Sequence, residues 1–288
     1  MIIEKLDLKH KEILFGRLKK VDTLISEYSF ANLYLFRRAH NYEVIKDNAD
    51  IFVKGITYDK KCYLMPTIPF NELDIKKVDR ILREVDCIFP LDYQWIEGIE
   101  DRYCVTSNIN DTDYIYTIEK MSTFKGRNLH GKRNLLKQFT ENYNCTIKPL
   151  TEENKKDAIM VVEEWQKSLG EPPEETDFHA NIEAIQYCED LFICGLLYYI
   201  SDKPVGLIMG EEIREDTFAI HFAKGLKGYK GIYQYIYNSF ANMLPKKYEY
   251  LNFEQDLGKP SLRQAKSSYE PDIMIHKYRL SLRERCSC

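Results

Sequence analysis

Residues 224–231, KGLKGYKG, separate a segment of strand character, Thr217–Ala223, from an amphipathic segment, Ile232–Leu244. Three glycines and three lysines in eight residues are typical of a loop, and the apolar period of the segment after it predicts a helix. Glycines let a backbone approach an anion closely, and the first turn of a helix offers unpaired N–H groups. The sequence therefore predicts a strand, an anion-binding loop and a helix, with an ordinary turn bearing solvated lysines as the alternative.

The segments on both sides of this loop continue as short strands and helices. Strands are expected at Cys145–Pro149, Phe192–Ile200, Val205–Ile213, Thr217–Ala223, Tyr248–Glu254 and Ile273–Leu280, and helices at Thr151–Leu169, His179–Cys188, Ile232–Leu244 and Ser261–Ser268. The resulting order is β-α-α-β-β-β-α-β-α-β. This order predicts an α+β domain with a mixed, mostly antiparallel sheet flanked by helices.

The first half of the chain repeats this pattern in a weaker form. Helices are expected near residues 8–20, 29–38 and 71–86, and strands near 43–45, 51–57 and 62–68. The sequence PTIPFNEL stands where a second glycine-rich loop would lie. We therefore predict two tandem domains, residues 1–123 and 124–288, with the working site in the second domain.

A basic segment, residues 124–143, opens the second domain. It is expected to form a linker helix whose bases are Lys125, Arg127, Lys132, Arg133 and Lys137. Its apolar residues recur on one helical face, which leaves the bases on another. This face is a candidate surface for tRNA, and a solvated helical face is the alternative.

Composition limits the classes of protein that fit. The chain has 288 residues, 44% of them hydrophobic and 30% charged, with a formal charge of −4. These values are typical of a folded protein and argue against a general nucleic-acid coat. No apolar run approaches the ~18 residues of a membrane span, and the N-terminus lacks the apolar core of a signal peptide.

The eight cysteines are scattered and include no C-x-x-C pair, so no zinc site is expected. Cys286 and Cys288 are too close together for a usual zinc knuckle, and several other cysteines, such as Cys194, lie in apolar runs. Reduced thiols and a cytoplasmic location are therefore expected. No motif of a serine hydrolase, zinc protease, nucleotide triphosphatase or dehydrogenase is present.

The element order around the glycine loop resembles the GCN5-related N-acetyltransferase fold. The basic linker, the segment EYSFANLYLFRRAHNYEV (residues 27–44) and the segment NFEQDLGKPSLRQAKSSYEP (residues 252–271) are together similar to a bacterial family grouped with the C-terminal domain of phosphatidylglycerol lysyltransferase. The resemblance spans nearly the whole chain. It implies tandem acetyltransferase-like domains and acyl or aminoacyl transfer from acyl-coenzyme A or aminoacyl-tRNA, without a metal.

Acyl transfer requires that the phosphates of the donor be held. The residues expected to do this are Lys224, Gly225, Lys227, Gly228, Lys230 and Gly231. Their spacing loosely matches the acetyltransferase pattern R/Q-x-x-G-x-G/A, with a lysine at the last glycine.

Acyl transfer also requires that the incoming amine lose a proton. Glu254, aided by Asp256, is the candidate base, because the strand that carries it is expected to part from its neighbour, Thr217–Ala223. A carboxylate withdrawn from water at such a parting would have a raised pKa. The alternative is that Glu254 or Asp256 pairs with Arg263 or Lys266 to fasten the turn.

The remaining candidates surround the same gap. Tyr269 is expected to protonate the leaving group, with packing as the alternative role. Asn252, Arg263, Lys266 and His221 are expected to position substrate, with salt bridges and a hydrogen-bonded structural histidine as the alternatives.

Together these residues predict an acyl- or aminoacyltransferase that acts on an amine or hydroxyl of a small molecule, peptide or lipid. The rival hypothesis from another class is a non-catalytic module that binds an anionic ligand or partner on a degenerate acetyltransferase fold. A third hypothesis is RNA binding through the linker helix, which requires an affinity that falls steeply with salt.

Overall fold

The computed structural model describes residues 2–47 and 49–286, which form two compact units. Unit 1 comprises residues 1–113, 255–263 and 274–288, and unit 2 comprises 114–254 and 264–273. The units therefore differ from the predicted halves 1–123 and 124–288. Residues 114–123 belong with the second unit, and the end of the chain belongs with the first.

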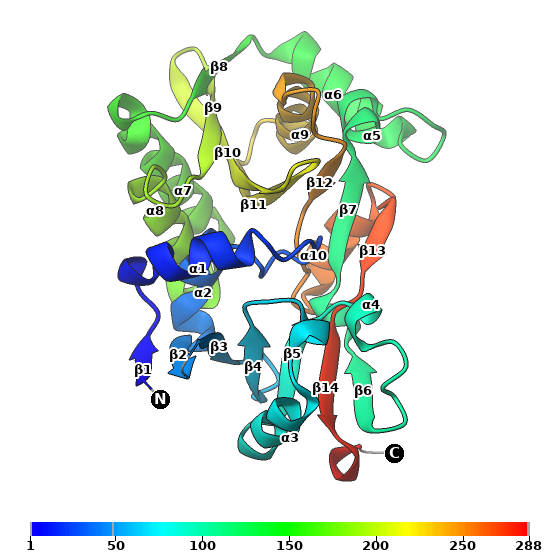
Figure 1. The fold of residues 1–288 in the computed structure, drawn as a ribbon. Coiled ribbons are helices and arrows are strands. Elements are labelled where there is room, and N and C mark those ends of the chain that lie inside the picture. Colours follow the sequence, from blue (N-terminus) through cyan, green and yellow to red (C-terminus); the bar gives the residue numbers. More distant parts are fainter. Residues whose placement is uncertain (1, 48, 287–288) are drawn as a thin grey trace. The chain divides into compact units, whose positions relative to one another are not determined.

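Unit 1 contains a seven-stranded sheet (Figure 1). In spatial order its strands are β1 (Ile2–Lys5), β2 (Glu43–Asp47), β3 (Asp50–Ile56), β4 (Cys62–Pro66), β5 (Cys87–Leu91), β14 (Tyr278–Leu282) and β6 (Tyr103–Ser107). The helices of this unit are α1 (Lys11–Leu18), α2 (Phe30–His40), α3 (Ile75–Glu84) and α4 (Tyr93–Ile96). The apolar stripe of α3, with Val78, Ile81 and Leu82, packs in one core with Ile88 of β5 and Leu280 of β14.

Unit 2 is built on the second seven-stranded sheet. Its strands, in spatial order, are β13 (Ile273–Ile275), β7 (Asp113–Thr117), β12 (Tyr250–Asn252), β11 (Thr217–Gly225), β10 (Lys203–Arg214), β9 (Cys194–Ile200) and β8 (Cys145–Pro149). Its helices are α5 (Ile118–Thr123), α6 (His130–Asn142), α7 (Lys155–Leu169), α8 (Phe178–Gln186), α9 (Ile232–Met243) and α10 (Pro260–Ser267), the last shared with unit 1.

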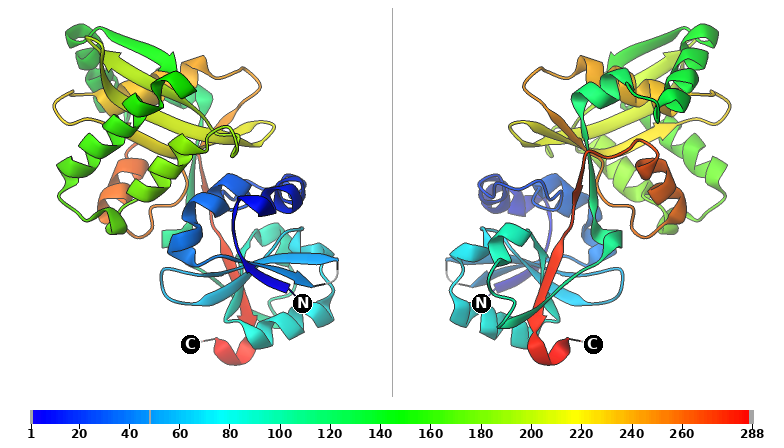
Figure 2. Two further views of the ribbon diagram at one scale, coloured as in Figure 1. Left: turned by 90° about the vertical axis from the view of Figure 1, so that its left-hand side faces the viewer. Right: turned by 90° about the vertical axis from the view of Figure 1, so that its right-hand side faces the viewer.

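Helices α7 and α9 cover opposite faces of the unit 2 sheet. Neighbouring residues of a strand point to opposite faces. On β9 the hydroxyl of Tyr198 donates to the carbonyl of Ile236 in α9, and the hydroxyl of Tyr199 donates to Asp157 in α7. Figure 2 shows this sheet from two sides, with α7 and α8 in green.

The predicted α+β class, with two mixed sheets flanked by helices, is confirmed. The predicted element order from Cys145 onward is also confirmed, with one correction. The last predicted strand, Ile273–Leu280, is two strands: β13 lies in the second sheet and β14 in the first. In the first half the sequence did not predict β5, β6 or β7.

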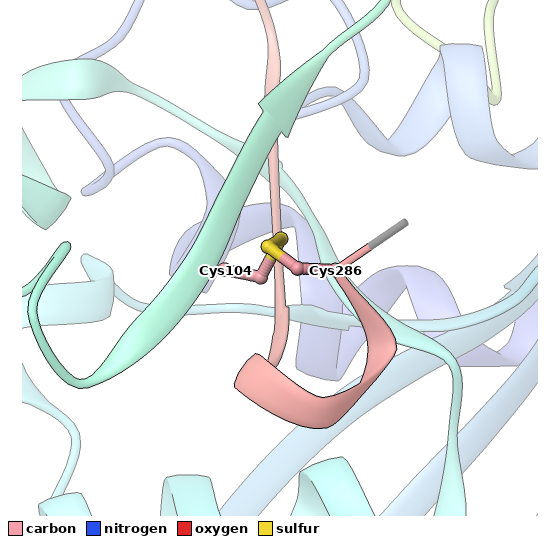
Figure 3. Close-up of a disulfide and its surroundings, with 2 residues drawn as sticks. All are labelled: Cys104 and Cys286. Atoms are coloured by element: carbon pink, nitrogen blue, oxygen red, sulfur yellow. A yellow bond between two sulfur atoms is a disulfide. The ribbon is translucent and has the colours of Figure 1, made fainter. Parts of the chain in front are cut away.

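A disulfide joins Cys104 on β6 to Cys286 at the end of the described chain (Figure 3). Their Cα atoms are 5.6 Å apart, and 182 positions separate them in sequence. These two cysteines therefore differ from the reduced state that the sequence predicted. Cys194, expected to be buried, is exposed; Cys288 lies outside the described residues.

Within residues 2–47 and 49–286, no helix combines the length and the apolar character that crossing a membrane requires.

Candidate active site

The site begins where β11 and β12 part. The two parallel strands pair only at Thr217–Tyr250, Phe218–Leu251 and Ala219–Asn252. β12 then ends, whereas β11 continues to Gly225. The parting of these strands that the sequence predicted is therefore present, because only three residues of each strand pair with the other.

A tight turn carries the chain away from β12 at Glu254. The backbone of Glu254 is left-handed, with φ of 58°, which is unfavourable for a residue with a side chain. The side-chain oxygen of Asn252 accepts the Glu254 N–H at 2.6 Å, and the Lys266 ammonium donates to the carbonyls of Phe253 at 2.6 Å and Glu254 at 3.0 Å. Asn252 and Lys266, predicted to position substrate, therefore fasten this turn.

A β-bulge sets the direction of His221. Met209 of β10 lies opposite Phe222, but the next residue, Gly210, lies opposite Ile220, so His221 is the extra residue on β11. A Cβ at Gly210 would lie 1.9 Å from the carbonyl oxygen of Ala219, so only glycine fits there. The bulge therefore breaks the simple alternation of side chains along β11 at His221.

The bulge places His221 between two carboxylates. Its Nδ1 lies 2.8 Å from Oε1 of Glu254, and its Nε2 lies 3.0 Å from Oε1 of Glu211 on β10. The side chains of His221, Glu211 and Glu254 are 0%, 5% and 11% exposed. Glu254 is thus turned away from bulk solvent and in contact with a histidine.

His221 is held as an imidazolium. Burial alone lowers the pKa of a histidine, but the charges and hydrogen bonds of Glu254 and Glu211 outweigh it and raise the pKa of His221 to about 10. Both ring nitrogens then act as donors, one to each carboxylate.

Asp256 and Arg263 fasten the turn after Glu254, which is the alternative that the sequence left open for them. Arg263 donates to both oxygens of the buried Asp256, at 2.7 and 2.9 Å, and also to the side-chain oxygen of Asn110 at 2.6 Å. Asp256 in addition accepts the Gly258 N–H at 2.8 Å. These contacts commit both side chains to the fold of unit 1.

Tyr269 lies in an aromatic cluster. Its ring contacts those of Tyr116, Phe124 and Tyr237, and the Lys132 ammonium lies 3.9 Å from its ring centroid. Its hydroxyl accepts a hydrogen bond from Gln234 at 2.8 Å, and burial raises its pKa. These contacts support the packing role that was the alternative for Tyr269.

The glycine loop forms an open pocket at the start of α9. Residues 225–234 line a pocket of about 330 Å³. Gly228 and Gly231 have φ of 98° and 88°, and a Cβ at Gly231 would lie 2.2 Å from the Leu135 carbonyl oxygen of α6. The left-handed Gly231 therefore allows the close packing of α6 against the base of the loop.

Of the predicted phosphate-binding residues, Lys224 lies elsewhere. It is 6% exposed, its ammonium is 2.7 and 2.9 Å from the two carboxylate oxygens of Asp177, and it lies 3.7 Å from a ring centroid of Trp165. The lysine at the end of β11 therefore belongs to the packing of α7. Lys227, Lys230 and the three glycines line the pocket.

The description "Phosphatidylglycerol lysyltransferase, C-terminal" belongs to the family that matches residues 18–281. The chain is a member of this family. An uncharacterized protein of Mycoplasmoides gallisepticum is 22% identical over 203 residues, which cover 67% of this chain and 63% of that protein. The chain thus spans less than two thirds of the length of this relative.

Two solved structures resemble the fold over nearly the whole chain. A conserved protein of unknown function from Bacteroides thetaiotaomicron is 26% identical with a TM-score of 0.85, covering 98% of this chain and 100% of that one. L-PGS from Bacillus licheniformis is 13% identical with a TM-score of 0.60, covering 95% and 92%. The predicted relationship to the lysyltransferase family is therefore confirmed.

Two bases of the predicted basic helix of this family member are engaged within unit 2. Lys132 donates to Ser268 at 2.6 Å, and Arg133 donates to the carbonyls of Phe124 and Gly126. Lys137 forms an exposed pair with Glu141. Helix α6 confirms the later part of the predicted linker helix, but it begins at His130, so Lys125 and Arg127 precede it.

Glu211 is the member of the site that sequence analysis did not identify. It lies on β10, and the bulge that turns His221 toward it appears only in the strand register. A charged residue within the otherwise apolar run of β10 was the available signal. Among the residues that the structure describes, no group of three or more His, Cys, Asp or Glu side chains has the arrangement of a metal site.

Proposed function

We propose that the chain is an aminoacyl- or acyltransferase whose reacting centre lies in unit 2, where β11 and β12 part. The observation that carries the proposal is the contact of Glu254 with His221 at 2.8 Å, on a turn held in a left-handed conformation. Strained backbone that several contacts fix is a feature of functional sites. Membership in the lysyltransferase family supports aminoacyl transfer as the reaction class.

The donor in this proposal is an aminoacyl-tRNA or an acyl-coenzyme A. Its phosphates would bind at the pocket of residues 225–234, where the first turn of α9 presents N–H groups and Lys227 and Lys230 add positive charge. α6 packs against this loop at Gly231, and Lys137 of α6 and the bases Lys125 and Arg127 that precede α6 belong to the same unit. That proximity favours the larger anion, tRNA.

Glu254 is the proposed base. As the nitrogen or oxygen of the acceptor attacks the acyl carbonyl, its proton passes to the Glu254 carboxylate. The carbon–oxygen bond of an aminoacyl ester, or the carbon–sulfur bond of a thioester, then breaks, and the departing alkoxide or thiolate takes up that proton from Glu254, which regenerates the carboxylate. A small molecule, a peptide or a lipid headgroup supplies the acceptor.

The test compares the wild-type chain with E254Q, using tRNA charged with lysine and, separately, acetyl-coenzyme A. Glutamine keeps the shape of the side chain and an oxygen toward His221 but accepts no proton. Turnover should fall about 10²-fold or more, with donor affinity within about threefold. E249Q, at an exposed glutamate just before β12, is the matched control. Unchanged turnover in E254Q would remove Glu254 from the mechanism.

The same assay separates the proposal from a non-catalytic binding module. A donor that raises the melting temperature of the chain but is never consumed would favour binding without catalysis. If tRNA is the donor, its affinity should also fall steeply as salt is raised from 50 to 200 mM. A salt-independent affinity would exclude a tRNA surface on α6.

A cytoplasmic location is part of the proposal. Cytoplasmic thiols are kept reduced. In producing cells, the exposed free thiol of Cys194 should therefore react with a membrane-permeant iodoacetamide before lysis but not with a membrane-impermeant maleimide, and labelling by the impermeant reagent would contradict the location.

A further inference from the structure

Glu211 has no assigned role in the reaction, although it contacts the same histidine as the proposed base. Its side chain is 5% exposed, and its Oε1 lies 3.0 Å from Nε2 of His221. Burying a carboxylate is unfavourable unless a charge or hydrogen bonds compensate. An apolar residue at this position would fill the sheet without the unfavourable free energy of burying a carboxylate.

The geometry around His221 requires a doubly protonated ring. A neutral imidazole has one N–H donor, so it can satisfy only one of two ionised carboxylates. Here a carboxylate oxygen faces each ring nitrogen, at 2.8 Å for Glu254 and 3.0 Å for Glu211. With both carboxylates ionised, both contacts are satisfied together only when His221 is an imidazolium, and the orientation of the ring is then fixed at both ends.

We infer that Glu211 is a positioning residue: it keeps His221 charged and oriented, and His221 in turn holds the Glu254 carboxylate where β11 and β12 part. This inference rests on the proposed function for Glu254. Glu211 does not touch the reacting atoms in this scheme. It acts through His221, so its removal should change how the site depends on pH more than how the donor binds.

Two carboxylates contact the ring of His221. Glu211 comes from β10 and Glu254 from the segment after β12, and these two raise the pKa of His221. Helices α7 and α9 also pack on β11. Asp157 of α7 bonds Tyr199 of β9, and the α9 contact to Tyr198 of β9 is made by the backbone carbonyl of Ile236.

E211Q tests the inference without emptying the position. The glutamine amide can donate to Nε2 of His221, which permits a neutral ring that still donates from Nδ1 to Glu254. The matched control is E212Q, because Glu212 is the next residue of β10 and its Oε2 instead bonds Tyr248 at 2.8 Å and Lys247. A third variant, E211A, separates loss of charge from loss of side-chain volume.

Two measurements are made between pH 6 and 9.5: kcat and KM with lysine-charged tRNA, and the ¹⁵N shifts of the His221 ring in the full chain. We expect the wild-type ring to stay protonated through pH 9, and the E211Q ring to lose its proton between pH 6 and 8.5. In E211Q, kcat should fall about tenfold or more across that interval, with KM within threefold. E212Q should match the wild type in both measurements.

The outcomes are distinguishable. An E211Q ring that stays protonated through pH 9, or a kcat profile identical to that of the wild type, would overturn the role of Glu211. If the wild-type chain turns over neither donor, the proposed function fails instead. In that case the ring shifts still decide whether Glu211 is what holds His221 charged.

Discussion

Each unit contains a buried cation between two carboxylates, and the two arrangements differ in their access to solvent. In unit 1 the Lys277 ammonium lies 2.5 Å from Glu27, 2.7 Å from Asp113 and 2.6 Å from the side-chain oxygen of Gln255. The side chains of Lys277, Glu27 and Asp113 are 0%, 6% and 0% exposed. This closed cluster lies entirely within the interior of unit 1.

In unit 2 the cation is His221. One of its two carboxylates, Glu254, lies where β11 and β12 part. Glu254 is the most exposed member of that cluster, at 11%, and it alone has a left-handed backbone. The charge pattern is the same in both units, so the pattern by itself does not indicate chemistry. What distinguishes the two clusters is a carboxylate, Glu254, on a constrained turn where two strands part.

The largest expected effect comes from removing the cation of the closed cluster. K277M leaves two buried carboxylates without a counter-charge and should lower the free energy of unfolding by about 3–5 kcal/mol. H221Q should cost less, about 1–3 kcal/mol, because Glu254 is nearer to water. Urea denaturation of the full chain measures both.

A compensating variant sharpens this comparison. Adding E27Q and D113N to K277M removes the uncompensated charge and should restore more than half of the loss. If H221Q proves more destabilising than K277M, the distinction between a closed and an open cluster is wrong.

The next largest loss of stability is expected when the disulfide is removed. One of its cysteines lies close to Lys277 of the closed cluster in the sequence. Cys286 lies just beyond β14, the strand that follows Lys277, and its bond to Cys104 closes a loop of 182 positions. C286S should lower the free energy of unfolding by about 2–4 kcal/mol under non-reducing conditions. The control is C194S, which removes an exposed thiol that is not in a disulfide. Equal melting temperatures for C286S and C194S would show that the bond does not stabilise the fold.

The two clusters should also differ in the pH range over which they affect stability. Burial, partly opposed by Lys277, raises the pKa of Glu27 from 4.5 to about 7. A raised pKa in the folded state means that stability falls as pH rises, here between about 4.5 and 7, by at most about 1.4 kcal/mol per pH unit. For His221, with a pKa of about 10, the corresponding fall lies between 6.5 and 10.

The measurement is the difference in free energy of unfolding between wild type and variant across pH 4–10. E27Q should remove the fall in the lower window, and H221Q should remove the fall in the upper one. If the two differences change in the same window, the charge assignments of the clusters are incorrect.

The smallest change in the free energy of unfolding is expected from breaking an exposed ion pair, for comparison with the buried clusters. Lys137 and Glu141 on α6 form an exposed pair, with side chains 72% and 59% exposed. K137A should change the free energy of unfolding by less than about 0.5 kcal/mol, because water and salt screen such pairs. A change above 1 kcal/mol would mean that α6 contributes to stability through contacts other than this pair.

Much of the fold was predictable from local patterns. The amphipathic period of α3, α7 and α9 and the glycine loop before α9 identified these elements, because side-chain periodicity is a local property of the sequence. The parting of β11 and β12 was also predicted, together with the position of Glu254 at it. The resemblance to the acetyltransferase fold supplied this parting, whereas the order of the elements came from the residue patterns themselves.

The roles of individual polar residues were not predictable to the same degree. Asn252 and Lys266 fasten the Glu254 turn, Asp256 pairs with Arg263, and Lys224 packs on Trp165. Their residue types suit both substrate binding and structural pairing. The choice depends on neighbours that lie far apart in sequence.

The sequence by itself determined the strands and helices from Cys145 onward and where a glycine loop meets a helix. The tertiary structure alone decided that β14 joins the first sheet and β7 the second, and that a single extra residue on β11 turns His221 between Glu211 and Glu254. The physical reason is that hydrophobic period acts along the chain, whereas strand register and the pairing of buried charges depend on residues brought together only by folding.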